Sequence, residues 1–111
     1  MSQDYAGDLP PAAAYDLLRS DPKAQLIDVR TDGEWEAGHI EGATHITLRD
    51  FMAEQSQWPA DPTTPIVVYD NPTHRSSMAM TFLRLLGYEN VRALGGGVGA
   101  WTKAELPLVT D

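Results

Sequence analysis

The residues best suited to chemistry lie in the middle of the chain, between an apolar run and a helix-like segment. The run PIVVY spans 65–69, Asp70 follows it, and a short polar stretch then ends at Arg75. A strand, a short loop and a helix start can together hold an anion, because the first backbone N–H groups of a helix have no partner within the helix. The first residue of such a loop is placed to act as a nucleophile. In this chain that residue is an aspartate.

Several kinds of chemistry are excluded by composition. The sequence contains no cysteine, so disulfides, thiolate metal sites and every cysteine-based reaction are ruled out. Its histidines, His39, His45 and His74, are separated by six and then 29 residues. This spacing does not form a local metal-binding motif. We therefore expect neither a metal site nor another cofactor.

The charge balance is acidic. The 111 residues include 8 Lys and Arg against 16 Asp and Glu, which gives a formal net charge of −8. Nucleic acids and anionic membranes attract basic surfaces, so neither is expected as a partner. The N-terminal residues are not basic and lead into no sustained apolar stretch, and no run reaches the length of a membrane span. We expect a single domain over 1–111 in a soluble, cytoplasmic protein.

Apolar and amphipathic segments alternate along the chain. Strands are expected at 24–29, 43–47, 65–69 and 90–94, and helices at 10–20, 33–37, 48–58, 75–86 and 99–104. Thr31 and Glu34 have the spacing of a capping box at the start of the second helix, and Gly38 is its expected end. This alternation predicts an α/β domain with a parallel sheet that is covered on both faces.

Three segments carry a resemblance to a known family. They are LIDVRTDGEWEAGHIEGATHI, IVVYDNPTHRS and LLGYENVRALGGGVGAWTKAELPL, which begin at Leu26, Ile66 and Leu85. In this order and spacing they resemble the rhodanese-like domains, the sulfurtransferase homology fold. The resemblance implies a five-stranded, mostly parallel sheet flanked by helices. It also implies an active loop at the carboxyl end of the strand that ends at Tyr69, where open α/β sheets tend to bind ligands.

In that family the loop begins with a cysteine and has an arginine at its sixth position, and its backbone N–H groups cradle an anion. The cysteine thiolate attacks a sulfur donor and carries the sulfur as a persulfide. The corresponding positions here are Asp70, Asn71, Pro72, Thr73, His74 and Arg75. The resemblance thus implies an anion-binding loop formed by Asn71, Thr73, His74, Arg75 and Ser76. The related cell-cycle phosphatases use a loop one residue longer, so phosphoryl chemistry is disfavoured.

The loop departs from the family pattern at three positions. Asp70 cannot form a persulfide, and its negative charge disfavours an anionic donor. Its carboxylate is expected instead to cap the turn or helix, by accepting the N–H bonds of the cradle and pairing with Arg75. Pro72 lacks an N–H donor. Thr73 replaces the glycine of the family, which adopts left-handed conformations more easily.

Three functional hypotheses follow. The first is a domain that has lost its nucleophile and now binds or regulates, with a protein partner, a small anion or a sulfur-carrying protein at the loop. The alternative is an enzyme of another type, with Asp70 as base or nucleophile and Arg75 as an electrophilic clamp. A third is an altered version of an active enzyme, which the further changes at Pro72 and Thr73 make less favoured.

Other conspicuous residues are interpreted as scaffold. Asp28 and Arg30 are expected to form a salt bridge at a strand end, and His39 is expected to be hydrogen-bonded within the framework. Glycines 95–97 lack the lysine and serine of a phosphate-binding loop, so a close-packed turn is expected there.

The sequence around each tryptophan predicts whether that side chain is buried or exposed. Trp35 and Trp101 are expected to anchor the core. Trp58 lies in a polar stretch before Pro59, so we expect it to be exposed and to face a partner.

Overall fold

The protein folds around a five-stranded sheet, seen in a computed structural model that describes residues 8–71 and 74–110. The strands are β1 (Asp8–Leu9), β2 (Gln25–Asp28), β3 (Thr44–His45), β4 (Ile66–Tyr69) and β5 (Val91–Leu94). They are ordered β1-β5-β4-β2-β3, and every neighbouring pair of these described strands is parallel. The α/β fold expected from the sequence is confirmed. The short strand β1 was not predicted.

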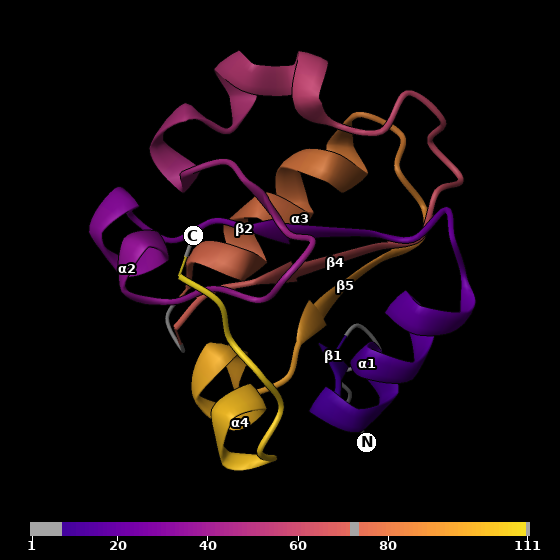
Figure 1. Ribbon diagram of the computed structural model, residues 1–111. Coiled ribbons are helices and arrows are strands. Elements are labelled where there is room, and N and C mark those ends of the chain that lie inside the picture. Colours follow the sequence, from indigo (N-terminus) through magenta and orange to yellow (C-terminus); the bar gives the residue numbers. More distant parts are fainter. Residues whose placement is uncertain (1–7, 72–73, 111) are drawn as a thin grey trace.

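The helical elements alternate with the strands along the chain. They are α1 (Pro11–Ser20), α2 (Asp32–Ala37), η1 (Leu48–Asp50), η2 (Met52–Gln57), α3 (Arg75–Leu85) and α4 (Gly97–Lys103). In Figure 1, α3 and the segment carrying η1 and η2 cover one face of the sheet, while α1 and α4 cover the other.

Strand β4 is apolar throughout because both of its faces are buried. Ile66 and Val68 pack into the core on the α3 face, whereas Val67 and Tyr69 pack into the core on the α1 and α4 face. All four side chains are buried. A strand that is covered on both sides has no solvent-facing position, so alternation of polar and apolar residues disappears.

The helix expected over 48–58 is not a regular α-helix. This stretch forms two short 3₁₀ helices, and Glu54 lies off helical geometry at φ −106° and ψ 35°. An α-helix would separate Phe51 and Trp58 by about 10 Å along its axis. In the structure their ring centroids are 5.0 Å apart, because the kinked segment folds both rings into the same core.

The expectation that Trp58 faces a partner is wrong. Its side chain is 6% exposed and contacts the Tyr88 ring edge-on, with centroids 5.8 Å apart. The aromatic neighbours supplied by distant segments outweigh the polar residues next to it in sequence. Trp101 is buried as expected, and its Nε1 donates to the carbonyl of Pro107 at 2.9 Å. Trp35 is half-buried.

The glycine run forms the expected turn between β5 and α4. Gly96 has φ 73° and Gly97 has φ 62°, both in the left-handed region that favours glycine. A Cβ on Gly96 would come within 2.6 Å of the Ala100 Cβ, so no larger residue fits without displacement. No helix within the described ranges is long and apolar enough to cross a membrane.

Candidate functional site at the loop after strand β4

Asp70 lies at the centre of the carboxyl edge of the sheet, directly after β4. Its side chain is 3% exposed, and Oδ2 accepts a hydrogen bond from the Ser76 backbone N–H at 2.9 Å. Ser76 is in the first turn of α3, so Asp70 satisfies one of the donors that a helix start leaves open. The Asp70 carbonyl also accepts the N–H of Val98 at 2.8 Å, which ties the loop to α4. The carboxylate therefore takes the capping role anticipated from the sequence.

Arg75 is held by a residue that the sequence did not indicate as its partner. Its Nη1 and Nη2 donate to the two carboxylate oxygens of Glu34 at 2.6 and 3.1 Å. The hydrogen bonds from Arg75 lower the pKa of Glu34 to about 2, and Glu34 raises the pKa of Arg75. The charge of Asp70 also raises the pKa of Arg75, which agrees with the attraction expected between these two residues. The loop arginine is in addition bound to α2 through Glu34.

Glu34 can act this way because the capping box of α2 fixes its carboxylate. Its Oε1 accepts the Thr31 N–H at 2.9 Å, and the Thr31 hydroxyl oxygen accepts the Glu34 N–H at 3.2 Å. The capping box expected from the sequence is confirmed, and helix α2 ends at Gly38 as expected. Nothing in the sequence linked Glu34 to Arg75, because the two residues are 41 positions apart.

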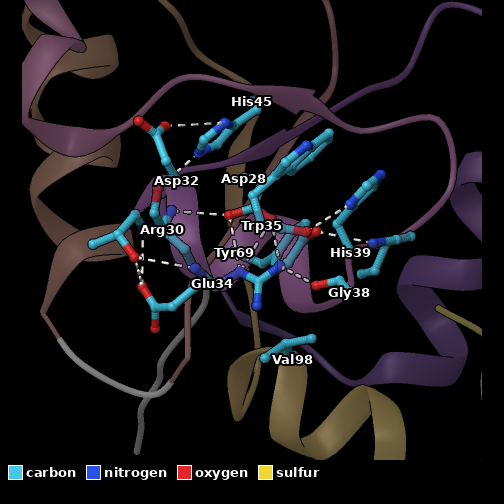
Figure 2. Close-up of polar contacts among 12 residues, drawn as sticks. Asp28, Arg30, Asp32, Glu34, Trp35, Gly38, His39, His45, Tyr69 and Val98 are labelled. Atoms are coloured by element: carbon cyan, nitrogen blue, oxygen red, sulfur yellow. Dashed lines mark hydrogen bonds and ion pairs between the residues drawn. The ribbon is translucent and has the colours of Figure 1, made fainter. Parts of the chain in front are cut away.

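A buried ion pair supports the other side of the site, as Figure 2 shows. Arg30 Nη2 donates to Asp28 Oδ2 at 2.8 Å and to the Gly38 carbonyl at 2.7 Å. Burial opposes the charge on Arg30, but the hydrogen bonds and charge of Asp28, together with Tyr69, raise the pKa of Arg30 overall. Burial also raises the pKa of Tyr69, whose hydroxyl oxygen accepts the Ile40 N–H at 3.0 Å. The pair forms the scaffold that was expected at this strand end.

Trp35 joins α2 to this scaffold through two histidines. Its ring stacks on His39 with centroids 3.5 Å apart and on His45 with centroids 4.7 Å apart, and Figure 2 shows these rings beside the ion pair. His39 is 4% exposed and its Nδ1 contacts the Trp35 carbonyl at 2.9 Å. His45 Nε2 contacts the Arg30 carbonyl at 2.8 Å. The scaffold role expected for His39 agrees with these contacts.

The remaining loop positions differ in their exposure to solvent. Asn71 and His74 are exposed, and His74 is the residue immediately before α3. Ser76 is buried and contributes its backbone N–H to Asp70. The expectations for Pro72 and Thr73 lie outside the described residues.

Two cavities flank the loop along the carboxyl edge of the sheet. One, of about 320 Å³, is lined by Asp8, Asp70, His74, Ser76, Ser77, Ala93, Leu94, Gly96 and Gly97. We call it the aspartate cavity. The other, of about 440 Å³, is lined by Val29, Arg30, Thr31, Asp32, Gly33, Thr47, Leu48, Arg49 and Arg75. We call it the arginine cavity.

The two residues proposed for catalysis therefore face different spaces. Asp70 lines the aspartate cavity, and Arg75 lines the arginine cavity. No sequence pattern indicated that Asp8 would lie beside Asp70, because strand β1 is only two residues long. Within the described part of the chain, no group of three or more His, Asp or Glu side chains could hold a metal ion.

The chain belongs to the rhodanese-like domain family: the family model matches residues 11–104. Among curated proteins, it is 34% identical over 103 residues to a thiosulfate sulfurtransferase GlpE from Haemophilus influenzae (strain PittEE). That match covers 93% of this chain and 94% of the relative. A sulfurtransferase from Allochromatium vinosum is 33% identical over 84 residues, which cover 76% of this chain and 77% of that protein.

Solved structures show the same fold. The Alr3790 protein from Anabaena sp. matches with a TM-score of 0.83 at 27% identity, covering 93% of this chain and 82% of the other. A thiosulfate sulfurtransferase from Pseudomonas aeruginosa matches with a TM-score of 0.86 at 27% identity. That match covers 95% of this chain but only 20% of the longer protein.

Proposed function

We propose that this rhodanese-like domain does not transfer sulfur and instead acts as a cytoplasmic binding or regulatory module. The observation that carries the proposal is Asp70, which stands where the family's nucleophile is expected in a chain without cysteine. A persulfide requires a thiol, and methionine sulfur, with two carbon substituents, cannot replace one.

The position of the Asp70 carboxylate supports this proposal. It is buried and accepts the Ser76 N–H at 2.9 Å, so a carboxylate of the protein itself occupies the start of α3. An anionic sulfur donor at the same place would meet a like charge in a poorly solvated position. The protein therefore lacks the nucleophile and also disfavours the class of donor that several of its relatives' names specify.

The charges at the aspartate cavity favour a protein partner over a small anion there. Asp8 and Asp70 both line this cavity, and among the described residues that line it His74 is the one basic side chain. A lysine or arginine of a partner would complement these carboxylates better than an anion would. The alternative, an enzyme in which Asp70 and Arg75 act together, gains no support from two side chains that line separate cavities.

The test is a thiosulfate-to-cyanide sulfur-transfer assay on the purified protein, run beside Asp70→Cys and Asp70→Ser. We expect no turnover above buffer for the natural chain and for the serine control. Turnover by the natural chain would overturn the proposal. Turnover by the cysteine variant alone would place the loss at residue 70, whereas an inactive cysteine variant would place it in the loop as a whole.

A further inference from the structure

A third hollow lies away from the loop after β4, on the face of the sheet that α1 and α4 cover (Figure 1). Its volume is about 320 Å³, and it is lined by Tyr15, Leu18, Arg19, Ile40, Glu41, Trp101 and Pro107. We call it the α1 groove. None of these residues lines the aspartate cavity or the arginine cavity, so the groove is a separate surface of the molecule.

The floor of the α1 groove is apolar and is already fixed by contacts within the protein. Ile40 and Trp101 are buried, and the rings of Tyr15 and Trp101 meet edge to face with centroids 5.9 Å apart. The Trp101 Nε1 donates to the Pro107 carbonyl at 2.9 Å, and the Ile40 N–H donates to the Tyr69 hydroxyl at 3.0 Å. A floor that is formed before binding reduces the entropy that binding costs.

Two exposed side chains of opposite charge, Arg19 and Glu41, stand at the rim of the groove. The guanidinium carbon of Arg19 lies 5.2 Å from the centroid of the Tyr15 ring. Contact with a ring occupies the flat face of a guanidinium and leaves the N–H donors at its edge available. Among the described residues, neither Arg19 nor Glu41 forms an ion pair. The groove therefore offers one cation and one carboxylate on either side of an apolar floor.

We propose that the α1 groove binds an extended segment of a partner protein in which one bulky apolar side chain lies between an acidic and a basic residue. The apolar side chain packs on Ile40 and Trp101, the acidic residue pairs with Arg19, and the basic residue pairs with Glu41. Charge complementarity at both ends of the groove supports this occupant over a purely apolar or purely anionic one.

The size of the groove and the charge of the molecule agree with such a segment. A volume of about 320 Å³ is near the lower limit for pockets that enclose a small ligand, so the groove suits a single side chain of a longer chain. A segment with one charge of each sign has no net charge and is not repelled by a protein of net charge −8. The proposal goes beyond the function proposed above, because it holds whether or not sulfur transfer occurs.

The test is a titration of the full chain with a capped tripeptide that has phenylalanine between glutamate and lysine, followed by amide chemical shifts. Both orders of glutamate and lysine are titrated. We expect saturable shifts at residues 15–19 and 40–41 and at the Trp101 indole N–H, and a tripeptide with alanine in place of phenylalanine should not reproduce them. Shifts that never saturate, shifts centred on Ser76 and Gly96, or an equal response to the alanine tripeptide would overturn the proposal.

Matched variants separate the rim charges from the fold. Arg19→Gln changes an exposed side chain and should weaken binding about two- to fivefold, because it removes one surface ion pair with the tripeptide. It should not weaken binding of a tripeptide with glutamine in place of glutamate. The control Arg92→Gln makes the same charge change at an exposed position outside the groove and should leave binding unchanged. Equal losses in both variants, or an Arg19→Gln loss that persists with the glutamine tripeptide, would contradict the proposal.

Discussion

At the scale of the residue, one side chain links the loop after β4 to the start of α3. The Asp70 carboxylate satisfies a backbone donor of α3 from within the protein, where the family's loop offers its donors to an anion. Asp70 can thus add to the stability of the helix that follows it. The hydrogen bond from Ser76 to Asp70 therefore joins the loop to α3 structurally.

Variants of Asp70 test this stabilising role. Asp70→Ala leaves the Ser76 N–H buried without this acceptor, which should lower the free energy of unfolding by about 1–3 kcal/mol. Asp70→Asn keeps an acceptor oxygen and should lose less. Urea unfolding followed by circular dichroism measures both values. An alanine variant as stable as the natural protein would show that the hydrogen bond contributes nothing.

The Glu34–Arg75 ion pair predicts a specific pH dependence. The pKa of Glu34 is lowered from 4.5 to about 2 by its hydrogen bonds with Arg75. A carboxyl with a lowered folded-state pKa stabilises the protein above its unfolded pKa, and this contribution is lost as pH falls from about 4.5 to 2. Glu34→Gln should therefore flatten the fall in stability across that range.

Glu36 supplies the control for this measurement, because it is exposed and lies on the same short helix. Glu36→Gln should keep the acid dependence of the natural protein when unfolding is followed at several pH values. If Glu34→Gln and Glu36→Gln gave the same profile, the ion pair would not be the source of the effect. The partial exposure of Glu34 keeps the expected amplitude small.

At the scale of the element, α3 connects the loop to the core. Its first turn meets Asp70 and Glu34, while Ala79, Met80 and Leu83 pack on the sheet. The helix is therefore held at its start by polar contacts and along its length by apolar ones.

Two leucines on α3 test how this helix is held. Leu83 is fully buried, whereas Leu85 is 76% exposed. Leu83→Ala should cost about 2–5 kcal/mol of stability through lost contacts and a residual cavity, while Leu85→Ala should change it by about 0.5 kcal/mol or less. Denaturant unfolding of both variants measures the difference. Similar losses in the two would contradict the packing of α3 described above.

At the scale of the whole molecule, most of the fold could be predicted from the sequence. Apolar runs located four of the five strands, and three family-like segments in register predicted their sheet. Strand β1 was missed because two residues show no periodicity. The 3₁₀ geometry of 48–57 was missed because long-range aromatic packing of Phe51 and Trp58 decides it.

The candidate site was less predictable than the fold. The capping role of Asp70 could be inferred, because it depends on a local strand, loop and helix. The partner of Arg75 could not, because Glu34 approaches it only after α2 and α3 have packed at the same edge of the sheet. The arginine cavity likewise depends on three segments that are distant in sequence.

The absence of a thiol implies that the natural chain cannot carry sulfur at the loop after β4. The most direct measurement is the intact mass of the purified protein before and after incubation with thiosulfate, with Asp70→Cys treated in parallel. We predict an unchanged mass for the natural chain, because it contains no thiol to hold a persulfide. A gain of one sulfur atom that cyanide then removes would contradict the claim.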